Sequence, residues 1–133
     1  MRSDTASITI EAHPASVLAI LAEPAALPRW AIGFAKSVAR TEHGWEVELA
    51  SGGRVPIRYV VDHELGVVDF HMEPASGVEA VAHARVLANG AGSEVVFTQF
   101  QGDQPEGVFD AQAQAVRHEL IVLKALAETE CPR

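Results

Sequence analysis

The last long segment of the chain, Pro105 to Glu128, places the strongest constraint on the fold. Pro105 suits a first helical position, and from there to Glu128 the chain has a single Gly, Gly107, and no further Pro. The apolar residues of the segment recur at steps of three and four and therefore share one helical face: Phe109, Ala113, Val116, Leu120, Leu123 and Ala127. This pattern predicts one long amphipathic helix. Because nearly every earlier segment reads as a strand, we expect the helix to lie across a sheet with a pocket between them.

The segments before this helix follow a distinctive order. Ser7–Glu11 alternates polar and apolar residues, as a half-buried strand does, and Pro14 then begins a helix that Glu23-Pro24 ends. A second short helical piece runs from Leu27 to about Phe34. The remaining segments, separated by turn residues, predict a meander of about six antiparallel strands: Lys36–Thr41, Trp45–Leu49, Arg54–His63, Val67–Glu73, Val78–Ala88 and Ser93–Gln101.

The turns suggest how these strands pair. If Leu65-Gly66 is a two-residue loop, Tyr59 lies beside Met72, and Val61 lies beside Phe70. The same reasoning across the turn at Pro74-Ala75-Ser76-Gly77, and across the next turn, predicts an inner face that includes Val81, His83, Arg85, Val95, Phe97 and Gln99. One row across that face would read His63, Val68, His83 and Gln99. A slip of one residue would instead turn Ala80, Ala82 and Ala84 inward and leave His83 and Arg85 in solvent.

Composition narrows the class of protein. The 133 residues suit one domain, residues 1–133, and the net charge of −8 with ten scattered Lys and Arg argues against a nucleic-acid partner. No run of about 18 apolar residues is present, so membrane insertion is not expected. Cys131 is the single cysteine and forms no internal disulfide, which favours a reducing, cytoplasmic location.

Three stretches of the chain resemble one known superfamily. Ile8–Val17 (ITIEAHPASV), Leu21–Trp30 (LAEPAALPRW) and Gly90–Val95 (GAGSEV) are similar to segments of the START/Bet v 1-like (SRPBCC) superfamily, which includes polyketide cyclase/dehydrase-type and lipid-transfer proteins. The resemblance extends from about Ser7 to Glu128. It implies an α+β helix-grip fold: a curved antiparallel β-sheet, with two short helices after the first strand, wrapped around a long C-terminal α-helix. It also implies a cavity for an apolar or amphipathic small molecule.

Candidate ligand contacts come from each predicted wall of this cavity. They are Trp30, Phe34, Trp45, Tyr59, His63, Phe70, His83, Arg85, Phe97, Gln99, Phe109, Gln112 and Val116. His63 and His83 are suited to general acid–base chemistry, and Arg85 to binding a carboxylate or enolate oxygen. Each also has an ordinary structural role open to it, in the core or at the surface. No metal site or cofactor is expected, since no inward carboxylate or thiolate completes a set of three or four ligands.

Three functions remain open at this point. The first is binding of a small hydrophobic or aromatic molecule between the sheet and the last helix. The second is a polyketide cyclase/dehydratase-like enzyme in the same cavity, with His83, Arg85 and Tyr59 as its reactive groups. The third is a partner-binding or dimer module with a filled cavity, and the sequence is compatible with either a monomer or a homodimer.

Overall fold

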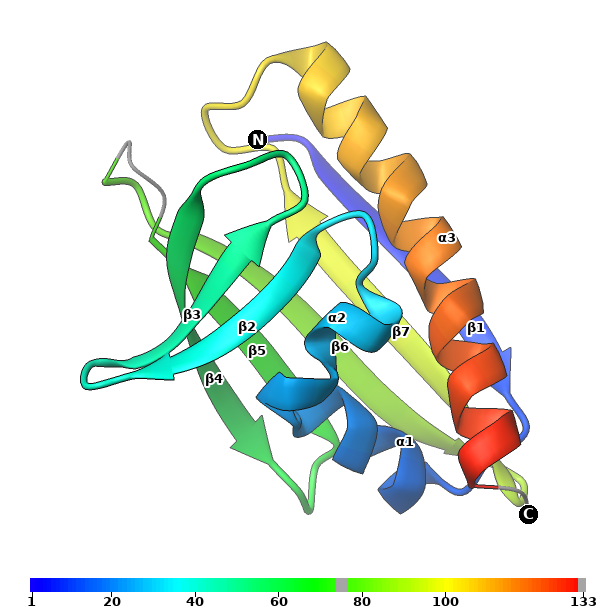
Figure 1. Cartoon of the computed structure of the whole chain (residues 1–133). Helices are drawn as coiled ribbons and strands as arrows, with labels where there is room; N and C mark the ends of the chain where they lie inside the picture. Colours follow the sequence, from blue (N-terminus) through cyan, green and yellow to red (C-terminus); the bar gives the residue numbers. More distant parts are fainter. Residues whose placement is uncertain (74–76, 132–133) are drawn as a thin grey trace.

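The computed structural model describes residues 1–73 and 77–131. Its elements follow one another in the predicted order of strand, short helices, strands and long helix (Figure 1). Their bounds are β1 Ser3–Ile10, α1 Pro14–Ala22, the 3-10 helix η1 Pro24–Ala26, α2 Leu27–Trp30, β2 Ala35–Thr41, β3 Gly44–Leu49, β4 Arg54–Asp62, β5 Val67–Met72, β6 Ala80–Asn89, β7 Gly92–Phe100 and α3 Glu106–Glu130. Within the described ranges, no helix is both long enough and apolar enough to cross a membrane.

The strands form one antiparallel sheet in the order β1-β7-β6-β5-β4-β3-β2. β1 and β2 lie at opposite edges, so α1, η1 and α2 carry the chain from one edge to the other across the concave face (Figure 1). The sheet curves around α3, which lies along β1 (Figure 1). The predicted α+β class and the packing of a long helix across a curved antiparallel sheet are confirmed.

Helix α3 buries the face that its sequence pattern predicts. The buried positions include all six of the predicted apolar residues, together with one carboxylate, Glu119. Pro105 is the N-cap rather than the first helical residue, and the helix continues two residues beyond the predicted end at Glu128. The apolar face therefore positions α3 against the sheet, and Glu119 with it.

The predicted pairing of β4 with β5 is wrong by two residues. Tyr59 pairs with Phe70, not Met72, and Val61 pairs with Val68. The cause is the turn between these strands, which is longer than two residues because the Asp62 carboxylate accepts hydrogen bonds from two backbone N–H groups at the start of the turn, each at 3.0 Å. A shift of two residues preserves which face each side chain occupies, so Tyr59 and Phe70 still share the inner face.

The predicted inner face of β6 is wrong. Phe70 pairs with Ala82 and Val68 with Ala84, and both alanines are buried. His83 and Arg85 consequently lie on the outer face, as in the one-residue slip considered above. The predicted row of His63, Val68, His83 and Gln99 therefore does not form. The predicted turn at Pro74-Ala75-Ser76 lies outside the described residues. On β7 the predicted inward residues are correct, since Val95 and Phe97 are buried.

Candidate functional site: a cavity between the sheet and the long helix

A cavity of about 680 Å³ separates the concave face of the sheet from the first half of α3. Its wall is formed by α2 and the loop after it, by the inner faces of β3 to β7, and by α3 from Gly107 to Glu119. Phe70 lies at the centre of the aromatic part of this wall, with its ring centroid 6.2 Å from Trp30, 6.1 Å from Phe97 and 5.1 Å from Tyr59. The small alanines that face Phe70 from β6 leave space in front of these rings.

Seven of the thirteen predicted ligand contacts line the cavity: Trp30, Phe34, Phe70, Phe97, Gln99, Gln112 and Val116. Trp30 comes from the last residue of α2, and Phe34 from the loop that leads into β2. Gln99 lies near the end of β7, and Gln112 and Val116 lie on the cavity side of α3. The structure brings these residues to one space, while their contact with a ligand stays a prediction.

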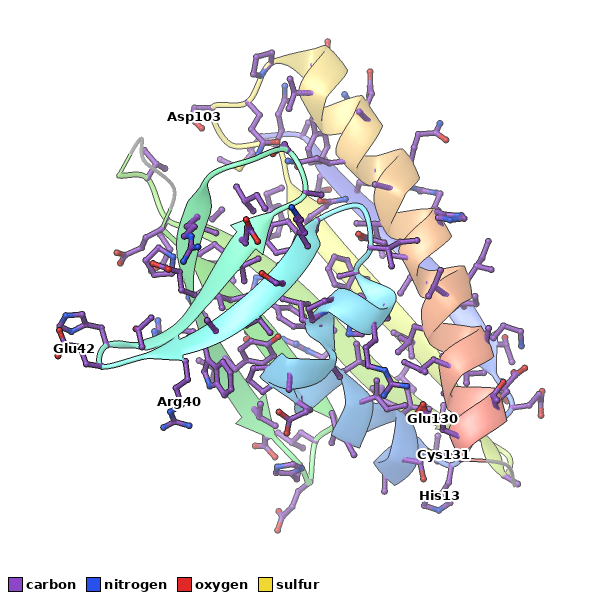
Figure 2. The ribbon with its side chains drawn as sticks, in the orientation of Figure 1. His13, Arg40, Glu42, Asp103, Glu130 and Cys131 are labelled. Atoms are coloured by element: carbon purple, nitrogen blue, oxygen red, sulfur yellow. The ribbon has the colours of Figure 1, made fainter. Side chains whose placement is uncertain are left out.

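Three predicted aromatic contacts lie elsewhere. Trp45 packs beneath the guanidinium of Arg40, 5.5 Å from the ring centroid, and Arg40 projects outward from β2 (Figure 2). Phe109 is fully buried, with the guanidinium of Arg2 over its ring at 5.0 Å. Tyr59 packs edge-on against Phe70, and burial raises the pKa of its hydroxyl. All three residues act in packing rather than in lining the cavity.

The three predicted basic residues also lie outside the cavity. His63 is an exposed residue of the turn after β4. His83 and Arg85 share the carboxylate of Asp69 on the outer face of the sheet, each at 2.8 Å. Burial opposes ionisation of Asp69, but the hydrogen bonds from Arg85 and His83 outweigh it and lower the pKa of this carboxyl. Because β6 is turned over relative to the prediction, His83 and Arg85 cannot meet a ligand in this cavity.

Three buried polar atoms at the cavity wall have no hydrogen-bond partner among the described residues. They are Nε1 of Trp30, Nε2 of Gln99 and Oε1 of Gln104. Trp30 is only 3% exposed, so its indole N–H is held away from solvent. A buried donor or acceptor without a partner costs about 1–3 kcal/mol, which makes such atoms rare in folded proteins.

Glu119 adds a carboxyl group to the same wall. Its side chain points from α3 toward the loop after α2, where Oε2 accepts a hydrogen bond from the N–H of Gly33 at 2.9 Å. The backbone N–H of Phe34, which donates to the carbonyl of Ala31 at 3.0 Å, also lies close enough to stabilise the ionised carboxyl. Burial raises the pKa of Glu119 from 4.5 to about 7, although the two backbone N–H groups act in the opposite direction.

The loop after α2 packs closely against α3 at Gly33. A Cβ atom at Gly33 would lie 3.4 Å from both the Cβ of Ala115 and Oε2 of Glu119, which is an ordinary packing distance. Between them, α3 and this loop close one side of the cavity.

Searches of family models and of curated proteins returned no match to this chain. Solved structures do match. The Zhui aromatase/cyclase from Streptomyces sp. R1128 aligns with a TM-score of 0.76 at 14% identity, covering 96% of this chain and 93% of that one. The XoxI protein from Bacillus cereus aligns with a TM-score of 0.76 at 16% identity, with 96% of each chain covered. The di-domain ARO/CYC BexL aligns with a TM-score of 0.74 at 24% identity, and the alignment covers 94% of this chain and 46% of the BexL chain.

A fourth solved structure extends this set. Ara h 8.0201, a structure with the Bet v 1 fold, aligns with a TM-score of 0.70 at 13% identity over 97% of this chain and 99% of that one. The chain has the START/Bet v 1-like helix-grip fold. The resemblance seen in the sequence is thereby confirmed for the fold.

Within this helix-grip fold, Glu119 and Gln104 are two of the cavity residues that were not among the predicted contacts. Glu119 carries a signal that could have identified it, because it lies three residues after Val116 and four before Leu123, in the middle of the buried face. Gln104 carries none, since it belongs to the loop before α3 and follows no periodic pattern. Across residues 1–73 and 77–131, no group of three or more His, Cys, Asp and Glu side chains is arranged to hold a metal ion.

Proposed function

We propose that this protein binds a small hydrophobic molecule in the cavity between the sheet and α3. The observation that carries the proposal is the cavity itself, which is enclosed by a mainly apolar wall that includes Trp30, Phe70 and Phe97. A small apolar or amphipathic molecule would bury its apolar surface there. The volume of about 680 Å³ falls within the usual range for small-molecule sites, roughly 300–1,000 Å³.

The related solved structures support this class of function without naming a ligand. Two of them are described as aromatase/cyclase proteins, and both share the helix-grip fold at TM-scores of 0.74 and 0.76. The specific compound that this chain would bind does not follow from that likeness, because one fold serves many functions.

The two other functions have less support. The enzyme alternative depended on His83, Arg85 and Tyr59 facing the cavity, and none of the three lines it. The partner-binding alternative required a filled cavity, whereas the space here is about 680 Å³. Binding of a small molecule is therefore the function that the geometry favours.

Filling the cavity tests the proposal. Ala111 and Ala125 are both exposed residues of α3, but only Ala111 lines the cavity. We expect Ala111→Phe to weaken binding of 2-naphthamide, a neutral aromatic probe, by about tenfold or more, because the new ring occupies the space of the ligand. Ala125→Phe carries the same helix-propensity change and should leave the affinity within about twofold of wild type.

Calorimetric titration of the three proteins with 2-naphthamide measures these affinities. Circular dichroism of each variant confirms that the helix content is unchanged. Equal affinities in Ala111→Phe and the wild type, or no heat of binding in the wild type, would contradict the proposal.

A further inference from the structure

The cavity wall contains a single ionisable side chain. Of the described residues that line the cavity, only Glu119 is ionisable, and no Lys, Arg or His is among them. The nearest cations along α3 are held on other faces of the helix, since Arg117 pairs with Asp4 at 2.8 Å and Lys124 pairs with Glu128 at 2.6 Å. A negative charge in the cavity would therefore meet another negative charge and no counter-ion.

Glu119 is fixed where a ligand would meet it. It is 5% exposed, and its Oε2 accepts a hydrogen bond from the backbone N–H of Gly33 at 2.9 Å. A carboxylate offers about four acceptor positions, so acceptor positions remain for donors of a ligand. The group is thus suited to accept a hydrogen bond from an amide, amine or hydroxyl group.

The uncharged polar groups of the wall do not make the cavity favourable for a negatively charged ligand. The side chains of Trp30, Gln99, Gln104 and Gln112 contribute only neutral dipoles to this wall. Such dipoles satisfy a neutral polar ligand. They do not replace the counter-ion that a buried carboxylate needs, because burial of an unpaired charge is far more costly than burial of a neutral polar group.

We propose that Glu119 selects the ligand by its charge, so that the cavity takes molecules with neutral hydrogen-bond donors and rejects carboxylates of the same shape. This inference rests on the proposed binding function. It excludes fatty acids and aromatic acids as the ligand class, and it favours amides and alcohols on an apolar frame.

Two probes of nearly equal shape test the inference. 2-Naphthamide and 2-naphthoate differ mainly in that the second carries a full negative charge. At about pH 8, where Glu119 is mostly ionised, we expect the wild type to bind the amide about tenfold more tightly or better. In Glu119→Gln the wall has no charge, and the preference should shrink to about threefold or less.

A second variant separates the local charge from the overall charge of −8. Glu106 lies at the start of the same helix with a side chain 72% exposed, and Glu106→Gln changes the net charge by the same amount. We expect this variant to keep the preference of the wild type. Thermal melts of both variants confirm folding before the titrations.

The outcomes distinguish this inference from the binding proposal. If the wild type binds both probes equally, or if Glu119→Gln keeps the preference of the wild type, charge selection by Glu119 is wrong and cavity binding stands. If Glu106→Gln loses the preference as fully as Glu119→Gln does, the effect belongs to the overall charge, and the inference is also wrong. If neither probe binds the wild type, the proposed function and this inference both fail.

Discussion

Glu119 shows how one position in the fold changes the chemistry of its residue. The same carboxyl in an unfolded chain has a pKa of 4.5, and burial against the loop after α2 raises it to about 7. The backbone N–H groups of Gly33 and Phe34 limit the rise because they stabilise the ionised form. Near neutral pH the cavity therefore holds a mixture of the neutral and the ionised carboxyl.

This raised pKa predicts how stability depends on pH. Between pH 4.5 and about 7 the folded protein retains the proton of Glu119 and the unfolded chain does not, so stability falls as pH rises through this range. Glu119→Gln removes the effect. We expect the variant to gain free energy of unfolding relative to wild type across this window, by up to about 3 kcal/mol above pH 7.

Urea unfolding at a series of pH values measures this difference between the two proteins. Most other titrating groups are common to both and cancel. A difference that stays constant from about pH 4 to about pH 8 would show that Glu119 has an ordinary pKa in the folded state.

Single residues of the site were predictable to different degrees from the sequence. The buried apolar face of α3 was predictable, because the helical period fixes which side chains face the sheet, although Phe109 on that face lies outside the cavity and Glu119 was not among the predicted contacts. His83 and Arg85 were not, because a shift of one residue in the pairing of β6 exchanges its two faces. The partnerless state of Trp30, Gln99 and Gln104 depends on packing between distant segments, and no local pattern encodes it.

At the scale of the elements, the turns decide the register of the sheet. The turn after β4 is closed by Asp62 and ends at Gly66, whose φ is +67° and whose carbonyl accepts a hydrogen bond from the N–H of Val86 at 2.8 Å. A Cβ atom at Gly66 would lie 2.4 Å from the carbonyl oxygen of Val86. This turn therefore requires glycine for its backbone angle and also for its contact with β6.

A pair of alanine substitutions separates these two requirements. Gly90 has a similar φ of +60° with open space around it, so Gly90→Ala should cost only the left-handed conformation, about 1–2 kcal/mol. Gly66→Ala adds a clash with backbone and should cost about 1–3 kcal/mol more. Chemical denaturation of both variants gives the two free energies, and equal losses would contradict the close contact.

The pattern of turn residues located these turns, but it did not predict their lengths. Leu65-Gly66 was expected to be a complete two-residue loop, whereas Asp62 and the residues after it also belong to the turn. The hydrogen bonds that the Asp62 carboxylate accepts from backbone N–H groups lengthen this turn. Boundaries of this kind depend on hydrogen bonds that compete with the ladder of the sheet.

At the scale of the whole molecule, the order of the elements determines the architecture. One long amphipathic helix after a meander has a single concave face on which to bury its apolar side, and the two short helices cross that face at the other end (Figure 1). This much was predictable from the sequence. The volume of the cavity was not, because it depends on Ala82 and Ala84, rather than His83 and Arg85, facing Phe70 and Val68.

The most direct test of cavity binding uses the two tryptophans of the chain as internal reporters. Trp30 lines the cavity, and Trp45 packs under Arg40 outside it. In a ¹⁵N-correlated NMR titration with 2-naphthamide, we expect the indole N–H signal of Trp30 to shift and that of Trp45 to stay in place. Movement of the Trp45 signal alone, or of neither signal at saturating probe, would contradict binding between the sheet and α3.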